Sequence, residues 1–310
     1  MSHFNCTSAP QARDRRYDSS EDSARARHDL KGRKPLHTRV LSVAALGFIF
    51  SVALALGQQT PSSSPIPAAT RSEADCTGFI TKTHVPTEVI VLDGANNDLE
   101  ERIRQFTIHE SIYLYHRHKG NFSVGEEYSI VRPATVLFRT TRYNGEHWSV
   151  HTLGEPYEDV GRAKVTHVTP EGAVAEVSFT CGPIYPGDIA VPYQPRTIPD
   201  FVPAPLDRFA VRNGKIRGTI TAAYNNFASL GLGDIVYLNF GGKQGAEVGQ
   251  RYRVYYATRP PSAWSLFLYP PMPRETVGEI VVLSTQEKSA AAIIVSCTRD
   301  INVGYGVELE

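Results

Sequence analysis

The sequence predicts a mostly β protein with two tandem small antiparallel β-barrel or β-sandwich units after an N-terminal apolar helix. Three observations lead to this fold class. Glycine (24), proline (21) and tyrosine (15) are frequent among the 310 residues, and long helix-forming stretches are few, a composition typical of short strands joined by turns. An uncharged run occupies residues 40–57, and two glycine-rich blocks recur along the chain. The length leaves room for about two domains.

The apolar run at 40–57, VLSVAALGFIFSVALALG, predicts that the chain enters or crosses a membrane. Basic residues before the run hold that flank in the cytoplasm, and a helix satisfies its own backbone polar groups in the bilayer. Two outcomes fit. Ala55-Leu56-Gly57 has small residues where signal peptidase requires them, and cleavage there releases a protein beginning at Gln58. An uncleaved inner-membrane anchor fits equally, because eighteen residues reach the lower limit for spanning about 30 Å of hydrocarbon.

Composition places the other segments. Residues 1–39 are predicted to be a disordered basic cytoplasmic tail, and the Ser- and Pro-rich residues 58–75 a flexible linker. A first β unit is predicted over 76–193 and a second over 214–310. The proline-rich residues 194–213 suit the connection between them, because proline cannot donate to a β ladder and stiffens an extended chain.

The formal net charge of zero is unevenly distributed. Residues 1–57 hold nine Arg and Lys against five Asp and Glu, which leaves 23 basic and 27 acidic residues in the exported part. Nucleic-acid binding requires clustered cations that neutralise phosphates. The sequence therefore predicts a periplasmic or otherwise extracytoplasmic protein with no nucleic-acid partner.

The chain contains two ungapped repeats. Residues 111–131 align with 235–255 at an offset of 124 positions, and 160–187 align with 277–304 at an offset of 117. The repeated tyrosines are assigned to the core of each unit, namely Tyr113, Tyr128, Tyr237 and Tyr252. The repeated or neighbouring glycines are assigned to structural turns, namely Gly125, Gly161, Gly187, Gly241, Gly245, Gly249, Gly278 and Gly304.

The second repeat shows how each unit is expected to fold. IVYLNF and QRYRVYYA flank the glycine-rich GGKQGAEVG, which predicts a hairpin with one buried face. GEIVVLST and EKSAAAIIVSC flank a turn at 286–288 and predict a second strand pair. Each unit is thus expected to contain four to six short antiparallel strands. One helix is predicted over 97–106, where Leu99, Ile103 and Phe106 share a face.

The pattern GDIVYLNFGGKQGAEVGQRYRVYYATRP…VGEIVVLSTQEKSAAAIIVSCTRDINVGYGVEL resembles the C-terminal β domain of flagellar assembly protein T. It also resembles related modules that accompany LysM domains in bacterial envelope proteins. The resemblance covers about residues 231–309 and, more weakly, 109–193. The chain is more loosely similar to the paired β-barrels of rod-shape-determining protein C. These resemblances imply a periplasmic assembly or scaffolding role, with no catalytic residues to carry over.

Three cysteines follow the apolar run, and an oxidising compartment permits a disulfide. The repeat register places Cys181 opposite Thr298 and Cys297 opposite Thr180, so the two cysteines face opposite sides of equivalent strands. We therefore predict a candidate disulfide between Cys76 and Cys181, with Cys297 a buried core thiol. The alternative is that all three pack as reduced small hydrophobes.

No motif for nucleophilic catalysis, phosphate binding or a Cys-x-x-Cys metal site is present. We therefore expect a non-enzymatic protein with no cofactor and no metal. The alternative is a secreted metal-assisted hydrolase that uses His116, His118 and His151.

An aromatic and proline-rich segment of the second unit is a candidate partner surface, with Tyr256, Trp264, Phe267 and Tyr269 as its aromatic residues. Folding of this segment over its own barrel explains the residues equally well. With the export signal and the repeat, it predicts a non-catalytic cell-envelope scaffold, assembly or adaptor protein. The expected partners are an envelope protein or peptidoglycan, and the inner membrane through residues 40–57 if they are uncleaved.

Overall fold

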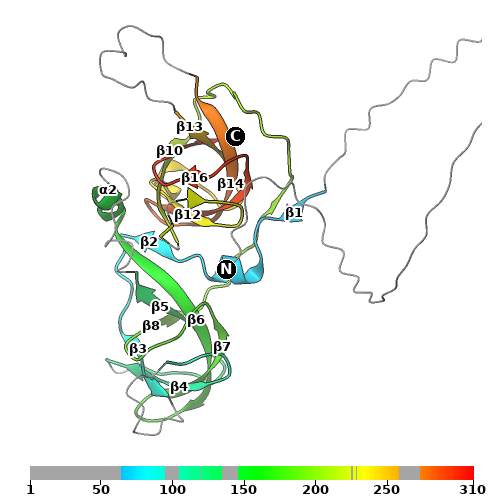
Figure 1. Ribbon diagram of the computed structural model, residues 1–310. Helices are drawn as coiled ribbons and strands as arrows, with labels where there is room; N and C mark the ends of the chain where they lie inside the picture. The colour runs from blue at the N-terminus through cyan, green and yellow to red at the C-terminus, as the bar shows by residue number, and fades with distance from the viewer. Residues whose placement is uncertain are drawn as a thin grey trace, which may run out of the picture. The chain divides into compact units, whose positions relative to one another are not determined.

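The structure is a computed structural model (Figure 1). It describes residues 64–94, 105–118, 120–134, 146–224, 226–227, 229–257 and 273–310. The predicted tail and apolar run lie outside these residues, as does most of the helix predicted over 97–106. Of that helix, Phe106 is described, and it forms an isolated β-bridge with Ile184 instead. A search of the described residues finds no helix with the length and apolar character to cross a bilayer.

The first β unit is a closed six-stranded antiparallel barrel. Its strands are β3 (Val89–Gly94), β4 (Ser111–His116), β5 (Glu127–Pro133), β6 (Glu155–Val168), β7 (Ala173–Thr180) and β8 (Ile189–Pro192). They pair in the order β6-β5-β8-β3-β4-β7, and β7 pairs back to β6. A short outer strand, β2 (Phe79–Thr81), adds to the start of β6, and α2 (Glu146–Leu153) lies in the connection from β5 to β6. We call this unit the first barrel.

The second β unit, hereafter the second barrel, is also a closed barrel. Its strands are β10 (Arg217–Ala223), β12 (Ile235–Leu238), β13 (Arg251–Tyr256), β14 (Glu275–Thr285), β15 (Ala290–Cys297) and β17 (Gly306–Leu309), and they pair in the order β10-β12-β15-β14-β13-β17. A 3-10 turn, η2 (Gly242–Gln244), lies in the hairpin from β12 to β13, and β11 (Ser229–Leu230) pairs with β16 (Ile301–Asn302).

The two barrels have the same topology and the same strand register, which confirms the internal repeat. Numbered along the chain, the six strands of each barrel pair in the order 1-2-5-4-3-6. Ile112 pairs with Ala175 in the first barrel, and the residues at offsets of 124 and 117, Val236 and Ala292, pair in the second. The ladders β5–β6 and β13–β14 also shift register at equivalent positions. The duplication therefore extends to individual residue pairs.

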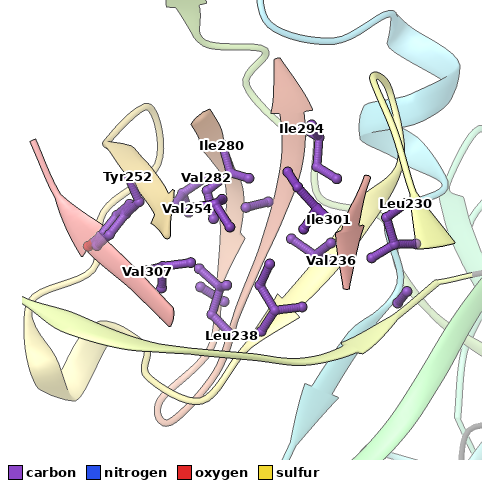
Figure 2. Packing of buried hydrophobic residues seen from close by; sticks show 14 of the residues in the cluster. Leu230, Val236, Leu238, Tyr252, Val254, Ile280, Val282, Ile294, Ile301 and Val307 are labelled. Atoms are coloured by element: carbon purple, nitrogen blue, oxygen red, sulfur yellow. The ribbon is translucent and has the colours of Figure 1, made fainter. Parts of the chain in front are cut away.

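Each barrel encloses a core of alternating strand residues. In the first barrel, Ile112 and Leu114 are buried in a cluster with Val91 and Ile130. In the second barrel, the side chains labelled in Figure 2, which include Val254, converge on the barrel interior. Each fully buried Leu or Ile contributes roughly 1.5–3 kcal/mol through the hydrophobic effect, so these clusters account for much of the stability of each barrel.

The four tyrosines assigned to the core differ in how they are buried. Tyr128 and Tyr252 are buried in the two barrel cores, as predicted. Tyr113 is 40% exposed, so its assignment to the core is wrong. Strand side chains alternate between faces, and Tyr113 lies between the inward Ile112 and Leu114. Tyr237, its equivalent, is buried, but it belongs to a cluster outside the barrel core.

Most of the glycines assigned to turns have the positive φ angles that favour glycine, namely Gly125, Gly187, Gly245, Gly249 and Gly304. Gly241 precedes η2 with extended backbone, and a Cβ there would lie 2.2 Å from the Gln286 carbonyl oxygen. The turn assignment is wrong for Gly161 and Gly278, which lie inside β6 and β14. A Cβ at Gly278 would lie 2.5 Å from the Ser296 carbonyl oxygen, so this position requires glycine for close approach of the neighbouring strand.

Part of the predicted flexible linker is ordered. Within it, β1 (Ile66–Pro67) pairs with β9 (Asp200–Phe201) of the proline-rich connection. The five-residue helix α1 (Arg71–Asp75) follows, and its N-cap Thr70 forms a reciprocal capping box with Glu73. Ala68 and Ala69 are buried together with Phe201 against the second barrel. Structured sequence therefore precedes residue 76, the predicted start of the first β unit.

Candidate protein-binding site

A buried ion pair joins the structured N-terminal segment, the first barrel and the proline-rich connection. Asp159 on β6 is buried, and Arg196 in the connection binds it through two hydrogen bonds, Nη1 to Oδ2 at 2.6 Å and Nη2 to Oδ1 at 2.9 Å. Arg196 Nη1 also contacts the carbonyl oxygens of Ala74 and Asp75 at the end of α1, at 3.1 and 3.2 Å. A cation is favourable at this end of a helix. The pair thus fixes three segments that are distant in sequence.

The residues next to this ion pair reach the second barrel. The Tyr237 hydroxyl, on β12, donates to the Thr77 carbonyl oxygen at 2.8 Å, while Arg196 Nη1 donates to the Thr77 hydroxyl at 2.8 Å. Gly78 donates its backbone N–H to Asp159 at 2.8 Å and has a φ of +61°, and a Cβ there would lie 2.7 Å from the Tyr237 hydroxyl. Glycine is therefore required at residue 78 both by its backbone conformation and by this close approach.

An apolar cluster completes the contact between the barrels. The second barrel contributes the outer side chains of β10, β12 and β15, namely Ala222, Ile235, Tyr237 and Ala291, which we call the covered face. The first barrel contributes Ile80 from β2, Ala134, and Val150 and Leu153 from α2, which we call the covering edge. The Ser289 hydroxyl also donates to the Ile80 carbonyl oxygen at 2.5 Å. Burial raises the pKa of Tyr237 well above its usual value, so its hydroxyl stays protonated as a donor.

The equivalent outer surface of the first barrel is exposed. Leu92 on β3 is 53% exposed, and Tyr113 and Tyr115 on β4 are each 40% exposed. Tyr115 pairs with the half-buried Ile90 on β3, and Tyr113 pairs with the half-buried Val174 on β7. We call these five residues the open face. A contiguous exposed apolar surface on adjacent strands is typical of a protein interaction site.

The repeat offsets show that the open and covered faces share two equivalent positions, while Asp93 and Ser111 take the places of Ala222 and Ile235. Tyr113 and Val174 of the open face correspond to Tyr237 and Ala291 of the covered face, at offsets of 124 and 117. In the second barrel this position is filled by protein. Packing of the first barrel on the second shows that this part of the barrel surface can form a protein contact. We therefore take the open face as the candidate functional site.

Of the four residues of the sequence-predicted partner surface, the structure describes Tyr256. Tyr256 is half-buried at the end of β13, where its ring lies 5.3 Å from that of Tyr305 and Arg299 stacks over it at 4.7 Å. Trp264, Phe267 and Tyr269 lie outside the described residues. Sequence reasoning missed the open face because it treated Tyr113 as core. Strict alternation along SIYLYH, with Ile112 and Leu114 inward, was the available signal.

The predicted disulfide between Cys76 and Cys181 is confirmed, with an S–S distance of 2.07 Å. It links the residue after α1 to the end of β7 and so closes a loop of 105 residues. Cys297 is disulfide-bonded as well, so its prediction as a buried core thiol is wrong. Cys297 is the last residue of β15 and is half-buried against the core of the second barrel, which leaves its sulfur accessible to a second cysteine.

The histidines of the hydrolase alternative occupy separate environments. His116, at the end of β4, lies 3.9 Å from a Glu88 carboxylate oxygen and packs edge-on against Phe122. His151, on α2, lines a cleft of about 690 Å³ with Lys82 and His84. His118 follows β4 and is exposed. Within the described parts of the chain, no three His, Cys, Asp or Glu side chains converge as metal ligands.

A second charge cluster lies on the outside of the second barrel. Arg251 Nη2 lies 3.2 Å from a Glu279 carboxylate oxygen and 2.9 Å from one of Glu310. Burial, followed by the hydrogen bond and repulsion from Glu310, raises the pKa of Glu279 to about 7 despite the opposing effect of Arg251. This carboxyl therefore changes charge near neutral pH.

The comparisons with known proteins do not indicate a function for this chain. No protein-family model matches the chain, and no curated protein matches it significantly. The resemblance of the second repeat to the flagellar and LysM-associated modules stays a prediction from sequence.

Replacing Arg196 with Ala should strongly destabilise the protein. The substitution leaves Asp159 buried without its cation, and we expect the free energy of unfolding to fall by about 2–4 kcal/mol in urea denaturation, allowing for the quarter of Arg196 that is exposed. Lys164→Ala is the control, because its ion pair with Glu127 across the β5–β6 ladder is largely exposed and should contribute less than about 1 kcal/mol. Equal effects of the two substitutions would contradict the assigned role of Asp159.

Removal of the hydroxyl should change the stability of the protein at one of the two equivalent tyrosines and not at the other. Tyr237→Phe deprives the buried Thr77 carbonyl oxygen of its donor and should lower the free energy of unfolding by about 1–2 kcal/mol. Tyr113→Phe removes an exposed hydroxyl and should leave stability unchanged within about 0.5 kcal/mol. Thermal and urea unfolding of both variants measure this difference. An equal loss of stability in Tyr113→Phe and Tyr237→Phe would contradict the finding that Tyr237 is buried while Tyr113 is exposed.

The raised pKa of Glu279 predicts a loss of stability with rising pH. The folded protein binds this proton more tightly than the unfolded chain, so the stabilisation is complete below the unfolded pKa of 4.5 and is lost as pH rises towards about 7. Glu279→Gln should remove this slope and raise the free energy of unfolding at pH 8 by on the order of 1–3 kcal/mol relative to the parent.

The matched control for this prediction is Glu287→Gln. Glu287 is fully exposed, and the Lys243 ammonium holds the pKa of its carboxyl below the usual value, so it does not titrate between pH 5 and 8. Urea unfolding across this range should therefore give parallel curves for Glu287→Gln and the parent protein. A parent curve that rises with pH over the same range would show that the predicted sign is wrong.

Proposed function

We propose that this chain is a non-catalytic scaffold or adaptor of the bacterial cell envelope that binds another protein through the open face of the first barrel. The observation that carries the proposal is the difference between equivalent surfaces. Tyr237 and its neighbours are buried by protein packing on the second barrel, whereas Tyr113, Tyr115 and Leu92 are exposed on the first. Aromatic side chains are enriched at the centres of protein interfaces.

The contacts between the barrels support a scaffolding role. The pair of Asp159 and Arg196, the hydrogen bond of Tyr237 and the disulfide of Cys76 and Cys181 hold the barrels and their connecting segments together. A partner bound to one barrel is then linked through these contacts to the other.

The envelope location rests on sequence. The apolar run at 40–57 with its basic flank indicates export or anchoring, and the resemblance of the second repeat to envelope modules implies the same compartment. We favour a protein partner over peptidoglycan because Leu92 and the half-buried Ile90 and Val174 make the open face aliphatic as well as aromatic. No observation favours the hydrolase alternative, and we do not propose it.

Site-specific photo-crosslinking in the native envelope tests this function. A benzoylphenylalanine placed at Tyr115 of the full chain should give a discrete protein adduct, because that side chain lies in the open face. The same probe at Val124, which is exposed in the hairpin from β4 to β5, is the control and should not give that adduct. Crosslinking to peptidoglycan alone, or the same adducts from both positions, would count against the proposal.

A further inference from the structure

Asp75, the last residue of α1, has a buried carboxylate whose charge is not matched by hydrogen bonds. Its side chain is 7% exposed, and within the described residues neither carboxylate oxygen has a hydrogen-bond partner. Arg71 Nη1 lies 3.8 Å from Oδ1 and Arg162 Nη2 lies 3.8 Å from Oδ2, which is too far for a direct hydrogen bond. Because burial of a carboxylate without hydrogen bonds is strongly unfavourable, these two oxygens require a further donor.

The Asp75 carboxylate borders a small cavity with polar walls. The cavity has a volume of about 20 Å³, and its walls include Arg162 on β6, Ser129 on β5 and the ion pair of Asp159 and Arg196. A single water molecule needs roughly 10–15 Å³ of such space and two to four polar partners. The cavity therefore has the volume and the polar groups to hold one water molecule.

The Arg162 guanidinium is held beside this cavity by aromatic rings. It lies 4.4 Å from the centre of the Tyr193 ring and 5.7 Å from the centre of the Phe179 ring, and both contacts are favourable for a cation. The β5–β6 ladder places Ser129 opposite Arg162. The guanidinium and the Asp75 carboxylate thus lie near each other without touching, and a polar separation of this length is typical of a bridging water molecule.

The charges around the cavity favour a neutral ligand. Three guanidinium groups, of Arg71, Arg162 and Arg196, interact with two carboxylates, of Asp75 and Asp159. A metal cation would be repelled by the guanidinium groups, and an anion would be repelled by the unpartnered carboxylate. A guanidinium only donates hydrogen bonds and a carboxylate only accepts them. A water molecule does both, so it can satisfy the two groups together.

We propose that this cavity binds one water molecule, which bridges Asp75 and Arg162. The water molecule donates a hydrogen bond to Asp75 Oδ2, accepts one from Arg162 Nη2, and forms a third with the Ser129 hydroxyl. It joins the end of α1 to β5 and β6, and it extends the network of Asp159 and Arg196 to a second carboxylate and a second guanidinium. This inference is independent of the proposed function, because it does not involve the open face.

Oxygen-17 magnetic relaxation dispersion of the full chain in mild detergent tests the proposal, because this method counts long-lived internal water molecules. Ser129→Val fills the cavity with methyl groups and leaves both charges in place, so the count should fall by one relative to the parent. Ser111→Val, the same change at a half-buried position on β4, is the control and should leave the count unchanged. A count that Ser129→Val does not lower overturns the proposal.

A stability measurement tests the role of the carboxylate. Asp75→Asn keeps the shape of the side chain but removes the charge that the water molecule binds, and it should raise the equilibrium constant for unfolding about tenfold. Asp200→Asn, at an exposed position on β9, should change this constant by no more than about twofold. Circular dichroism checks that both variants are folded. Equal effects of the two substitutions would contradict a bound water molecule at Asp75.

Two measurements on the parent protein identify the ligand without any variant. A high-resolution crystal structure should show one water molecule within hydrogen-bond distance of both Asp75 Oδ2 and Arg162 Nη2. A direct hydrogen bond between these two atoms, or a dry cavity, overturns the proposal. The unfolding temperature should be equal in sodium, potassium and choline chloride at one ionic strength. A rise that is specific to sodium or potassium and is lost in Asp75→Asn would assign the site to a metal cation instead.

Discussion

The buried pair of Asp159 and Arg196 is the constraint on which the arrangement of the two repeats depends. A carboxylate removed from water requires a cation and hydrogen bonds, and Arg196 reaches Asp159 only when the proline-rich connection lies along α1 and β6. The same guanidinium donates to the Thr77 hydroxyl, and the Thr77 carbonyl oxygen accepts a hydrogen bond from the Tyr237 hydroxyl. The electrostatics of one carboxylate thus fix the segment against which the second barrel packs.

The repeats differ at this position although their registers agree. The equivalent of Asp159 in the second barrel is Thr276, whose uncharged side chain cannot form an ion pair. Its backbone N–H donates to the Arg208 carbonyl oxygen, next to Phe209. The outer faces differ accordingly: one Tyr of the equivalent pair is buried at a contact and the other faces solvent. The difference in what packs on the two barrels therefore leaves one of the two equivalent tyrosines exposed.

The sequence allowed prediction of the fold to the level of strand register, because ungapped blocks with glycines in place constrain which residues pair. The offsets of 124 and 117 hold in the ladders, and the register argument led to the disulfide of Cys76 and Cys181. The block that relates β3 to β10 was missed because VIVLDG and GTITAA share no identical residue. Those strands are equivalent only in their pairing.

The candidate site was less accessible to prediction. Identity between Tyr113 and Tyr237 suggested a shared role in the core, yet burial on an outer face depends on what packs there, which no local pattern records. The partnership of Asp159 with Arg196 spans 37 positions and joins two residues with no motif around them. The order in residues 64–75 also depends on such distant contacts, whereas their composition alone indicated a flexible linker.

Hydroxyl-radical footprinting, quantified tyrosine by tyrosine on the full chain, tests the central claim most directly. Because Tyr113 and Tyr237 have the same intrinsic reactivity and the same place in each repeat, their relative modification rates report burial alone. The duplicated-barrel account predicts fast modification of Tyr113 and strong protection of Tyr237 in dilute protein. Equal modification of both tyrosines in dilute protein would contradict the account.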